Sequence, residues 1–302
     1  MIRIVALGEV APEIIEPLLR PGEMFISEPT EADLAEADAA IVRAAYRVDE
    51  HALDAMPQVR VLARTGVGTD LVNLDVTRER GIPVVITPGS NTNAVAEGVF
   101  AHMLSLVKYL PDLDALVRDD RWNDRTTVPA ADLDGKTLGI VGYGRIGKRV
   151  EKIARAFDMN VRAYDPIAEI PAEFRAETLA ELLAASDIVT LHLPLTADTA
   201  FLINADSIDE MRPGAILINC SRGGLVDLDA AVRALDSGKL GGFGVDVFDP
   251  EPPMHHELFD HHRVSLSPHL MGFTQQAMIA TVQDALRGIQ KVFDGDQSVA
   301  LA

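Results

Sequence analysis

Residues 136–165 read KTLGIVGYGRIGKRVEKIARAFDMNVRAYD, and this stretch decides the fold. It begins with a short apolar run, residues 137–141, that has the length of a buried strand. A glycine-rich turn follows, and residues 145–157 then have apolar side chains at helical spacing. A second apolar run, residues 161–164, ends in Asp165, 18 residues after Gly147. The stretch therefore predicts a strand, a helix and a second strand that form one βαβ unit.

The turn between strand and helix has the pattern G-x-G-x-x-G. Gly142 allows the tight turn, Gly144 lets a pyrophosphate approach the backbone, and Gly147 lets helix and strand pack closely. The helix N-terminus then offers unpaired N–H groups to the phosphates. The pattern also occurs as a glycine turn in ordinary βαβ units, but the complete unit favours a dinucleotide site. The predicted contacts are Gly142, Tyr143, Gly144, Arg145, Ile146 and Gly147.

Asp165 indicates which dinucleotide binds. A carboxylate at the end of the second strand accepts hydrogen bonds from the adenosine ribose hydroxyls and repels a 2′-phosphate. Pro166 follows, without an Arg or Lys directly after it to hold such a phosphate. The sequence therefore favours NAD over NADP as the cofactor.

Length and charge limit the class of protein. A chain of 302 residues with 48% hydrophobic and 24% charged residues is typical of a globular protein with two domains. Its net charge of −19 would repel nucleic acid and anionic membranes. We therefore expect neither as a partner, and a small anionic substrate would need a few local cations in a cleft.

The single cysteine, Cys220, excludes a disulfide within the chain. No apolar run is long enough to span a bilayer, and the start MIRIVALGEV lacks the pattern of a secretory signal. These features favour a reducing cytoplasm.

The rest of the chain also alternates strand and helix signals, which predicts an α/β fold with a doubly wound parallel sheet and a second, smaller α/β domain. Apolar runs predict strands at residues 2–7, 40–43, 59–63, 84–87, 188–193, 215–219, 242–247 and 264–267. Helices are expected at 49–55, 74–80, 93–120 (broken at Pro111) and 274–293. The helix at 93–120 is either an interdomain spine or a subunit contact. If the last helix packs back onto the first domain, that domain comprises residues 1–92 and 273–302, and residues 93–272 form the nucleotide domain.

Three side chains follow strands of the predicted nucleotide domain. They are Arg222 in NCSRGG, Glu251 in DVFDPEPP and His269 in SPHLMG. Ligands of doubly wound sheets bind at the carboxyl ends of the strands, so we expect these residues to converge at the nicotinamide end of NAD. A guanidinium matches a carboxylate bidentately, and histidine can transfer a proton near neutral pH when an adjacent carboxylate orients it. Each residue alone could equally be a surface cation, a solvated acid or a structural histidine.

The motifs GYGRIG, LHLPL, NCSRGGLVD, DVFDPEPP and SPHLMG, in this order, resemble the D-2-hydroxyacid dehydrogenase family. The resemblance extends over nearly the whole chain, because ARTGVGTDLVNLD and NAVAEGVFAHML also match. It implies a Rossmann domain plus a smaller flavodoxin-like substrate domain. It further implies that Arg222 holds the substrate carboxylate, His269 is the acid/base and Glu251 pairs with it.

The resemblance implies further contacts around the cofactor and substrate. Val67 and Gly68 would present N–H groups to the substrate carboxylate, although RTGVG could also be a simple turn. Asp246 would bind the nicotinamide amide, while His192 and Pro194 would line the adenine side. His192 could instead be a core histidine, and Cys220 a small filler beside the cofactor. The remaining expected cofactor contacts are Pro166, Thr199, Ser221 and Gly272.

Arg43 and Arg64 both end apolar strands of the first domain. The chain resembles the phosphoglycerate dehydrogenase branch, in which arginines at matching places contact the substrate phosphate. This favours a 3-phosphoglycerate-like substrate, unless the two arginines only pair with local acids. Glyoxylate or hydroxypyruvate reduction is the competing interpretation. Co-repressor scaffolds of the C-terminal-binding-protein type also share the fold, but the complete Arg222, Glu251 and His269 set favours an enzyme.

Two segments remain outside this interpretation. The cluster HHELFDHH contains His255, His256, His261 and His262, but its spacing matches no reliable metal site, so we expect a solvated loop and no metal. Trp122, the only tryptophan, is either a packing anchor or a subunit contact. The segment 93–120 has a long apolar face, formed by Val95, Val99, Met103, Leu106, Val107 and Leu110. We expect a homodimer that is built on this segment.

Overall fold

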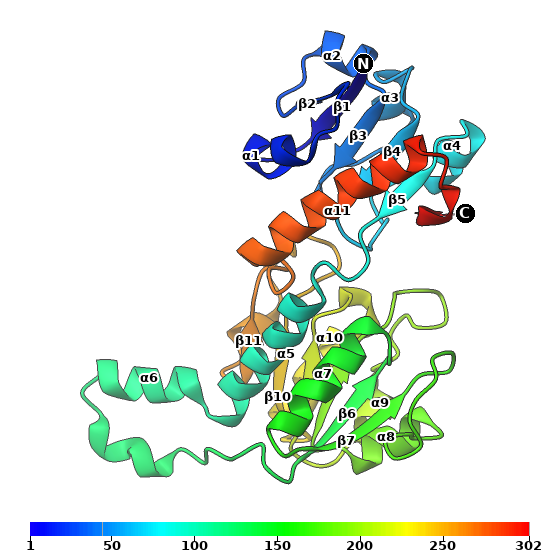
Figure 1. Ribbon diagram of the computed structural model, residues 1–302. Coiled ribbons are helices and arrows are strands. Elements are labelled where there is room, and N and C mark those ends of the chain that lie inside the picture. The colour runs from blue at the N-terminus through cyan, green and yellow to red at the C-terminus, as the bar shows by residue number, and fades with distance from the viewer. Residues whose placement is uncertain (44, 302) are drawn as a thin grey trace. The chain divides into compact units, whose positions relative to one another are not determined.

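The computed structural model describes residues 1–43 and 45–301, which divide into two compact units (Figure 1). Unit 1 comprises residues 1–91 and 273–302, and unit 2 comprises residues 92–272. Within the described ranges, no helix is long and apolar enough to cross a membrane.

Unit 1 is built on one six-stranded sheet, counted over its described residues, in the order β12-β5-β4-β3-β1-β2. All pairs are parallel except β12 with β5. Its elements are β1 (Ile2–Leu7), α1 (Pro12–Ile15), η1 (Glu16–Leu18), β2 (Glu23–Ile26), α2 (Glu31–Ala35), β3 (Ala39–Val42), α3 (Glu50–Asp54), β4 (Val61–Arg64), α4 (Leu74–Glu79), β5 (Val84–Ile86), α11 (Gln275–Phe293), η5 (Gln297–Val299) and β12 (Ala300–Leu301). The parallel part has the flavodoxin-like strand order.

Both faces of the unit 1 sheet are buried. Ile4 and Ala6 of β1 face one apolar cluster, whereas Val5 and Leu7 face another, as the period of two in a strand requires. Helix α11 covers the first of these faces. The C-terminal helix therefore completes the core of the N-terminal unit, which explains why unit 1 is discontinuous in sequence.

Unit 2 also contains a six-stranded sheet, counted over residues 92–272, in the order β11-β10-β9-β8-β6-β7. An isolated parallel bridge from Ala163 to Arg175 marks a seventh position beyond β7. The elements of unit 2 are α5 (Thr92–Val107), α6 (Leu110–Arg118), η2 (Trp122–Thr127), β6 (Thr137–Val141), α7 (Arg145–Ala156), β7 (Asn160–Tyr164), α8 (Leu179–Ala185), β8 (Ile188–Leu191), α9 (Ala205–Glu210), β9 (Ala215–Asn219), η3 (Gly223–Leu225), α10 (Leu228–Asp236), β10 (Leu240–Val245), η4 (Glu257–Asp260) and β11 (Val264–Leu266).

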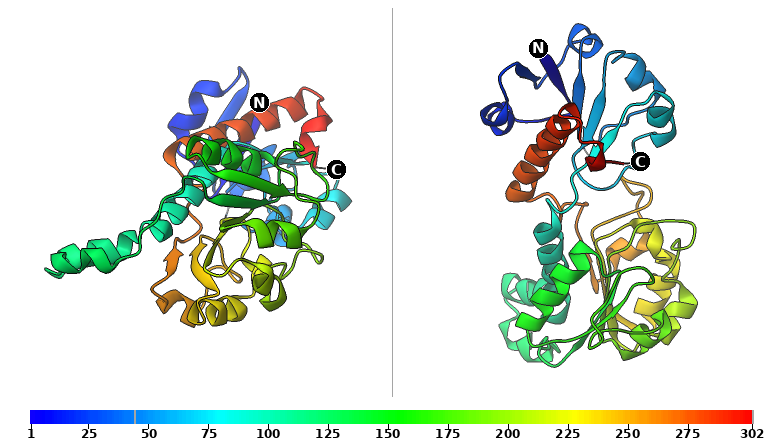
Figure 2. Two further views of the ribbon diagram at one scale, coloured as in Figure 1. Left: turned by 90° about the horizontal axis from the view of Figure 1, so that it is seen from below. Right: turned by 45° about the vertical axis from the view of Figure 1, so that its right-hand side comes forward.

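Helices cover both faces of the unit 2 sheet (Figure 2). Helices α5 and α7 pack on one apolar cluster, and α8, α9 and α10 pack on the other. All sheet pairs are parallel, so this is a doubly wound sheet. The predicted fold class, a Rossmann domain with a smaller flavodoxin-like α/β domain, is confirmed.

The helical segment predicted over residues 93–120 is present and interrupted, but it differs from the prediction in two respects. The break lies at Tyr109, whose φ of 54° ends the helical path, and Pro111 lies in the first turn of the second helix, where proline is well tolerated. In addition, Val95, Val99 and Met103 are buried inside unit 2, so most of the expected apolar face is internal. Only α6 and η2 extend away from the rest of this unit (Figure 1).

Other differences are smaller. Most expected strands begin or end within two residues of the observed ones, for example β3 and β10. The sequence interpretation missed β2 and β12, which lie at the edges of the unit 1 sheet. It also missed α8, α9 and α10, which are short amphipathic helices.

Candidate active site

The candidate residues of unit 2 lie at the carboxyl ends of its strands. The strand order reverses between β6 and β8, where the two following segments leave on opposite faces of the sheet. A crevice at such a switch point is the usual ligand position in this class of sheet. The glycine turn follows β6, and Arg222, Asp246 and His269 follow β9, β10 and β11.

The glycine turn has the shape that a pyrophosphate needs. Gly142 has a φ of +95°, and a Cβ there would lie 2.3 Å from the His192 carbonyl oxygen. A Cβ on Gly147 would lie 2.2 Å from the Gly142 carbonyl oxygen. At Gly144, in contrast, a Cβ would have no described atom within 4 Å, and among the described residues no side chain caps helix α7 there. Space is therefore left beside Gly144 at the start of α7, where phosphate oxygens can approach the helix N-terminus.

Asp165 forms the other wall of this turn. Its Oδ2 accepts a hydrogen bond from the Tyr143 N–H (2.7 Å), and its Oδ1 accepts from Ile167 (2.8 Å) and Ala168 (2.9 Å). Burial opposes ionisation, but these three bonds and the charge of Lys148 together hold the pKa of Asp165 below its ordinary value. A carboxylate has about four acceptor positions, so one remains for a hydroxyl. The charge and this remaining position fit the ribose of NAD.

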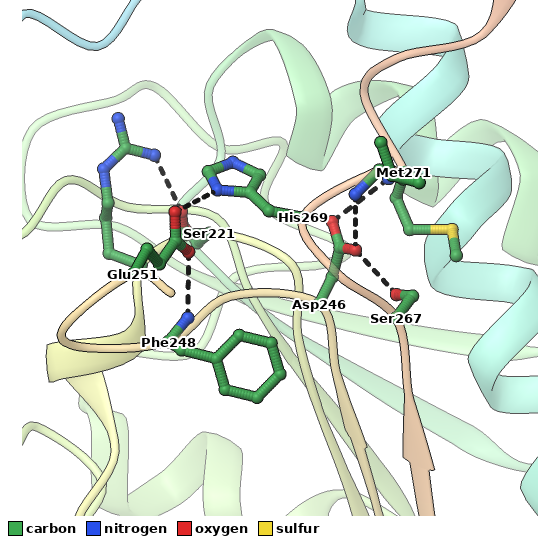
Figure 3. Close-up of polar contacts among 9 residues, drawn as sticks. Ser221, Asp246, Phe248, Glu251, Ser267, His269 and Met271 are labelled. Carbon is green, nitrogen blue, oxygen red and sulfur yellow. Dashed lines mark hydrogen bonds and ion pairs between the residues drawn. The ribbon is translucent and has the colours of Figure 1, made fainter. Parts of the chain in front are cut away.

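His269 and Glu251 form a direct pair (Figure 3). The imidazole Nδ1 lies 2.8 Å from Glu251 Oε2, and Glu251 Oε1 accepts the Phe248 N–H at 3.0 Å. The two side chains are 42% and 38% exposed, so the pair is accessible from solvent. Because Glu251 contacts Nδ1, the Nε2 atom lies on the opposite edge of the ring, where a substrate oxygen can meet it.

Arg222 belongs to the same edge of the sheet. Its Nη1 donates to the Ser221 carbonyl at 2.8 Å, and its own carbonyl accepts from Asn219 Nδ2 at 2.8 Å. The next residue, Gly223, lies directly against the loop that bears Glu251. A Cβ on Gly223 would come within 2.2 Å of the Phe248 carbonyl carbon. The arginine turn and the glutamate loop are therefore in backbone contact.

Asp246 is 2% exposed and holds the turn that contains His269 (Figure 3). Its Oδ1 accepts from Ser267 Oγ (2.6 Å) and the Leu270 N–H (2.9 Å), and its Oδ2 accepts from the Met271 N–H (3.2 Å). Its carbonyl accepts from the His269 N–H at 2.7 Å. One acceptor position on Oδ2 remains for the carboxamide expected at this residue.

The cofactor contacts that only the family resemblance implied lie near the same edge of the unit 2 sheet. Thr199 Oγ1 donates to the Pro194 carbonyl (2.8 Å), and Ser221 Oγ donates to the Leu193 carbonyl (2.6 Å), which joins the β8 and β9 loops. Cys220 is 8% exposed, and burial, followed by the nearby Asp246, raises the pKa of its thiol. A protonated, buried thiol fits the role of a filler. Pro166 and Gly272 lie at the ends of this region, directly after Asp165 and Met271.

His192 is partly buried as a residue, but its ring is enclosed. Its Nε2 lies 3.0 Å from Thr190 Oγ1, while no described residue bonds its buried Nδ1. Burial lowers the pKa of this imidazole to about 3, so it is neutral at neutral pH.

The candidates of unit 1 lie at the carboxyl edge of its own sheet. Arg43 follows β3 and Arg64 ends β4, and the two strands are neighbours in the sheet. Arg43 Nη2 contacts Met278 Sδ at 3.2 Å; burial lowers its pKa, which the charge of Glu9 partly offsets. Arg64 is 8% exposed and donates to the Thr65 carbonyl.

The loop after β4 contains the other two substrate candidates, Val67 and Gly68. Val67 is 50% exposed. The loop is anchored where the Gly66 N–H donates to Thr87 Oγ1 at 2.7 Å. Its backbone can therefore be reached by a ligand on this unit.

Three histidines of the segment 255–262 face carboxylates. His255 lies 3.3 Å from Asp260, His256 lies 3.1 Å from Asp229, and His261 lies 4.0 Å from Asp236. Among the described residues, no group of three or more possible ligands could hold a metal ion.

Sequence reasoning missed a buried polar group beside Asp246. His102 of α5 is 3% exposed, with Nδ1 2.8 Å from Ser265 Oγ and Nε2 2.9 Å from Ser267 Oγ. The only signal was one histidine within the apolar face of a predicted helix, and nothing in the sequence places it next to β11.

Comparison with known proteins shows which family the chain belongs to. Residues 100–271 match the family model described as "D-isomer specific 2-hydroxyacid dehydrogenase, NAD binding domain". The D-3-phosphoglycerate dehydrogenase of Bacillus subtilis is 36% identical over 92% of this chain and 54% of its own length. The chain thus spans about half the length of the curated relatives it matches.

Solved structures have the same fold over nearly the whole chain. A protein from Thermus thermophilus has a TM-score of 0.86 at 33% identity over 97% of both chains. The D-lactate dehydrogenase of Aquifex aeolicus, solved with NAD and lactic acid, has a TM-score of 0.81 at 28% identity over 98% of this chain and 97% of its own.

Proposed function

The chain belongs to the D-isomer specific 2-hydroxyacid dehydrogenases, and unit 2 contains the family's NAD-binding domain; on that premise we propose that it interconverts a small D-2-hydroxy acid and its 2-keto acid. The observation that supports this most directly is the His269–Glu251 pair beside Arg222 at the carboxyl edge of the NAD-binding sheet. This arrangement joins a proton donor and a carboxylate-binding cation at one place.

The residues would act on a 2-keto acid as follows. The Arg222 guanidinium binds the carboxylate and fixes the orientation of the keto group. NADH, when bound, supplies a hydride to the keto carbon. His269 donates its Nε2 proton to the carbonyl oxygen as the C=O bond becomes a C–O–H group, and Glu251 stabilises the imidazolium before the transfer. Oxidation of the hydroxy acid uses the same atoms in reverse.

We propose NAD as the preferred cofactor. Asp165 is held ionised by three backbone bonds, so a 2′-phosphate beside it would be repelled. A comparison of kcat/KM for NADH and NADPH with one keto acid tests this proposal. Equal values, or a preference for NADPH, would refute it.

For the substrate, we propose a 2-hydroxy acid with a second negative charge, such as 3-phosphoglycerate, with unit 1 as the substrate domain. Arg43 and Arg64 supply two cations at one sheet edge, and the N–H groups of Val67 and Gly68 lie on the loop after β4. Support also comes from the name D-3-phosphoglycerate dehydrogenase of several curated relatives.

The test is NADH consumption with a panel containing 3-phosphohydroxypyruvate, hydroxypyruvate, glyoxylate and pyruvate. The proposal expects the highest kcat/KM with the phosphorylated acid. A preference for glyoxylate or hydroxypyruvate would support the proposed reaction class but refute the proposed phosphorylated substrate. No turnover with any acid, despite NADH binding, would favour a scaffold.

We also propose a homodimer that is formed through α6 and η2. Leu110, Val117 and Trp122 expose 52%, 60% and 60% of their surfaces on this extension, which is more apolar surface than a free segment should present to water. A second copy is the partner that would bury it. Light scattering should give twice the chain mass, and Val117→Asp should give monomers. A wild-type monomer would contradict the proposal.

The proposed location is the cytoplasm. Cys220, the only cysteine, is buried with a protonated thiol, which suits a reducing compartment.

A further inference from the structure

A chain of buried polar side chains connects helix α5 with the turn that contains His269. His102 contacts two serines, Ser265 in β11 and Ser267 directly after it; the two are two residues apart, so extended backbone directs both to the same side. Ser267 then donates to Asp246. Every member belongs to unit 2.

The hydrogen bonds of this chain have one consistent direction. Ser267 has a single hydroxyl proton, and it is donated to Asp246 Oδ1 at 2.6 Å. Ser267 Oγ can therefore only accept from the imidazole, so the proton of His102 is on Nε2. Its Nδ1 is then an acceptor, to which the Ser265 hydroxyl donates a hydrogen bond with an Nδ1–Oγ distance of 2.8 Å. Burial lowers the pKa of His102, while Asp246 opposes this effect, and a neutral ring agrees with the assigned tautomer.

Close packing fixes His102 against the sheet. A Cβ on Gly244 of β10 would lie 2.8 Å from His102 Cβ, so this position lets α5 approach the strand. The imidazole thus has little freedom, and its Nε2–H occupies a lone pair of Ser267. As a consequence, the Ser267 hydroxyl stays directed at Asp246.

Asp246 connects this series of hydrogen-bonded side chains to His269, the proposed acid/base. Its carboxylate and carbonyl together accept the three consecutive N–H groups of residues 269, 270 and 271. His269 has a φ of 54°, a left-handed conformation that is unfavourable for a residue with a Cβ and persists only where the surroundings enforce it. We infer that His102 is a positioning residue: through Ser267 it holds Asp246, and thereby the strained backbone from which the His269 side chain projects.

Amide hydrogen exchange in the free protein tests this series of hydrogen-bonded side chains without any catalysed reaction. The His102→Leu variant fills a similar volume but removes both bonds, and Ser267→Ala removes the contact with Asp246. Both should speed exchange of the Leu270 and Met271 amides about tenfold. His102→Gln, which keeps an N–H near the position of Nε2, should restore slow exchange.

Ser186→Ala is the matched control. It removes a buried hydroxyl bond in unit 2, from Ser186 Oγ to the Leu182 carbonyl at 2.6 Å, away from this chain. It should leave the two amides protected. Unchanged exchange in both His102→Leu and Ser267→Ala would overturn the inference.

The kinetic consequence rests on the proposed dehydrogenase function. His102→Leu and Ser267→Ala should each lower kcat about tenfold and leave KM for the keto acid within about threefold, because Arg222 is untouched. The double variant should be no slower than either single one. Faster exchange with unchanged kcat would overturn the positioning role. Absence of turnover in the wild type would refute the proposed function instead, and the exchange result would still decide whether the chain holds the turn.

Discussion

The carboxyl edges of the two sheets differ in what their charged side chains contact. In unit 2 two carboxylates have side-chain partners, since Glu251 pairs with His269 and Asp246 accepts from Ser267. In unit 1, Arg43 contacts the sulfur of Met278 and Arg64 donates to the carbonyl of its neighbour Thr65, as Arg222 of unit 2 does to Ser221. The unit 2 edge therefore combines an arginine with an imidazole–carboxylate pair, whereas the candidates at the unit 1 edge are two arginines on neighbouring strands. On the proposed function, unit 2 determines the reaction and unit 1 determines which anion is accepted.

Among the tests of this division of roles between the two units, His269→Asn should have the largest effect. We expect kcat to fall about 10²–10⁴-fold with little change in NADH affinity, because the proton donor is lost but the glycine turn remains. Steady-state kinetics and an NADH fluorescence titration measure the two effects. His262→Asn, at an exposed histidine of the 255–262 segment, is the control and should change neither. A parallel loss of NADH binding would mean that the edge of unit 2 is not specialised for proton transfer.

The next test concerns unit 1. Arg43→Ala or Arg64→Ala should reduce the preference for 3-phosphohydroxypyruvate over glyoxylate about 10- to 100-fold, since one charge-assisted contact contributes about 1.5–3 kcal/mol. The ratio of kcat/KM values for the two acids is the measurement. Arg60→Ala, at an arginine that pairs with Asp38 on the surface, should leave the ratio unchanged. Equal losses on both acids would show that Arg43 and Arg64 are structural.

Glu251→Gln should have a smaller effect, a fall in kcat on the order of fivefold, because glutamine still accepts the Phe248 N–H. Steady-state kinetics of keto acid reduction measure this effect. An unchanged kcat would mean that the two residues do not act as a pair.

The smallest effect concerns stability. His192 has a folded pKa of about 3 against an ordinary value of 6.5, so the unfolded chain binds more protons between these values. Its neutral state therefore has no effect on stability above about pH 6.5 and destabilises the fold progressively as the pH falls towards 3. At pH 5 this amounts to roughly 2 kcal/mol, from about 1.4 kcal/mol per pH unit.

His192→Gln cannot titrate, and its amide can still reach Thr190. Urea unfolding at pH 7.5 and pH 5 should show a smaller loss of stability in this variant than in the wild type. The same loss in both proteins would contradict a buried neutral His192.

The fold was largely predictable from sequence because its strands are continuous apolar runs and its turns have glycines at fixed spacing. Arg222, Glu251 and His269 were visible for a similar reason, since each lies in the loop that follows a strand. The break at Tyr109 and the contact of His102 with two serines were not visible. At the break, no glycine or asparagine marks the left-handed conformation that Tyr109 adopts. The His102 contacts depend on how α5 packs on β10 and β11, which are more than 130 residues further along the chain. Local patterns do not contain that information.

The contact between Gly223 and Phe248 has a consequence for engineering. With only 2.2 Å between a hypothetical Cβ and the Phe248 carbonyl carbon, there is no room to alter one loop and keep the other in place. A designer who wants to move the guanidinium of Arg222 towards a longer acid would also displace the carboxylate of Glu251. The two loops are therefore best exchanged together, as one module transplanted from a single donor protein.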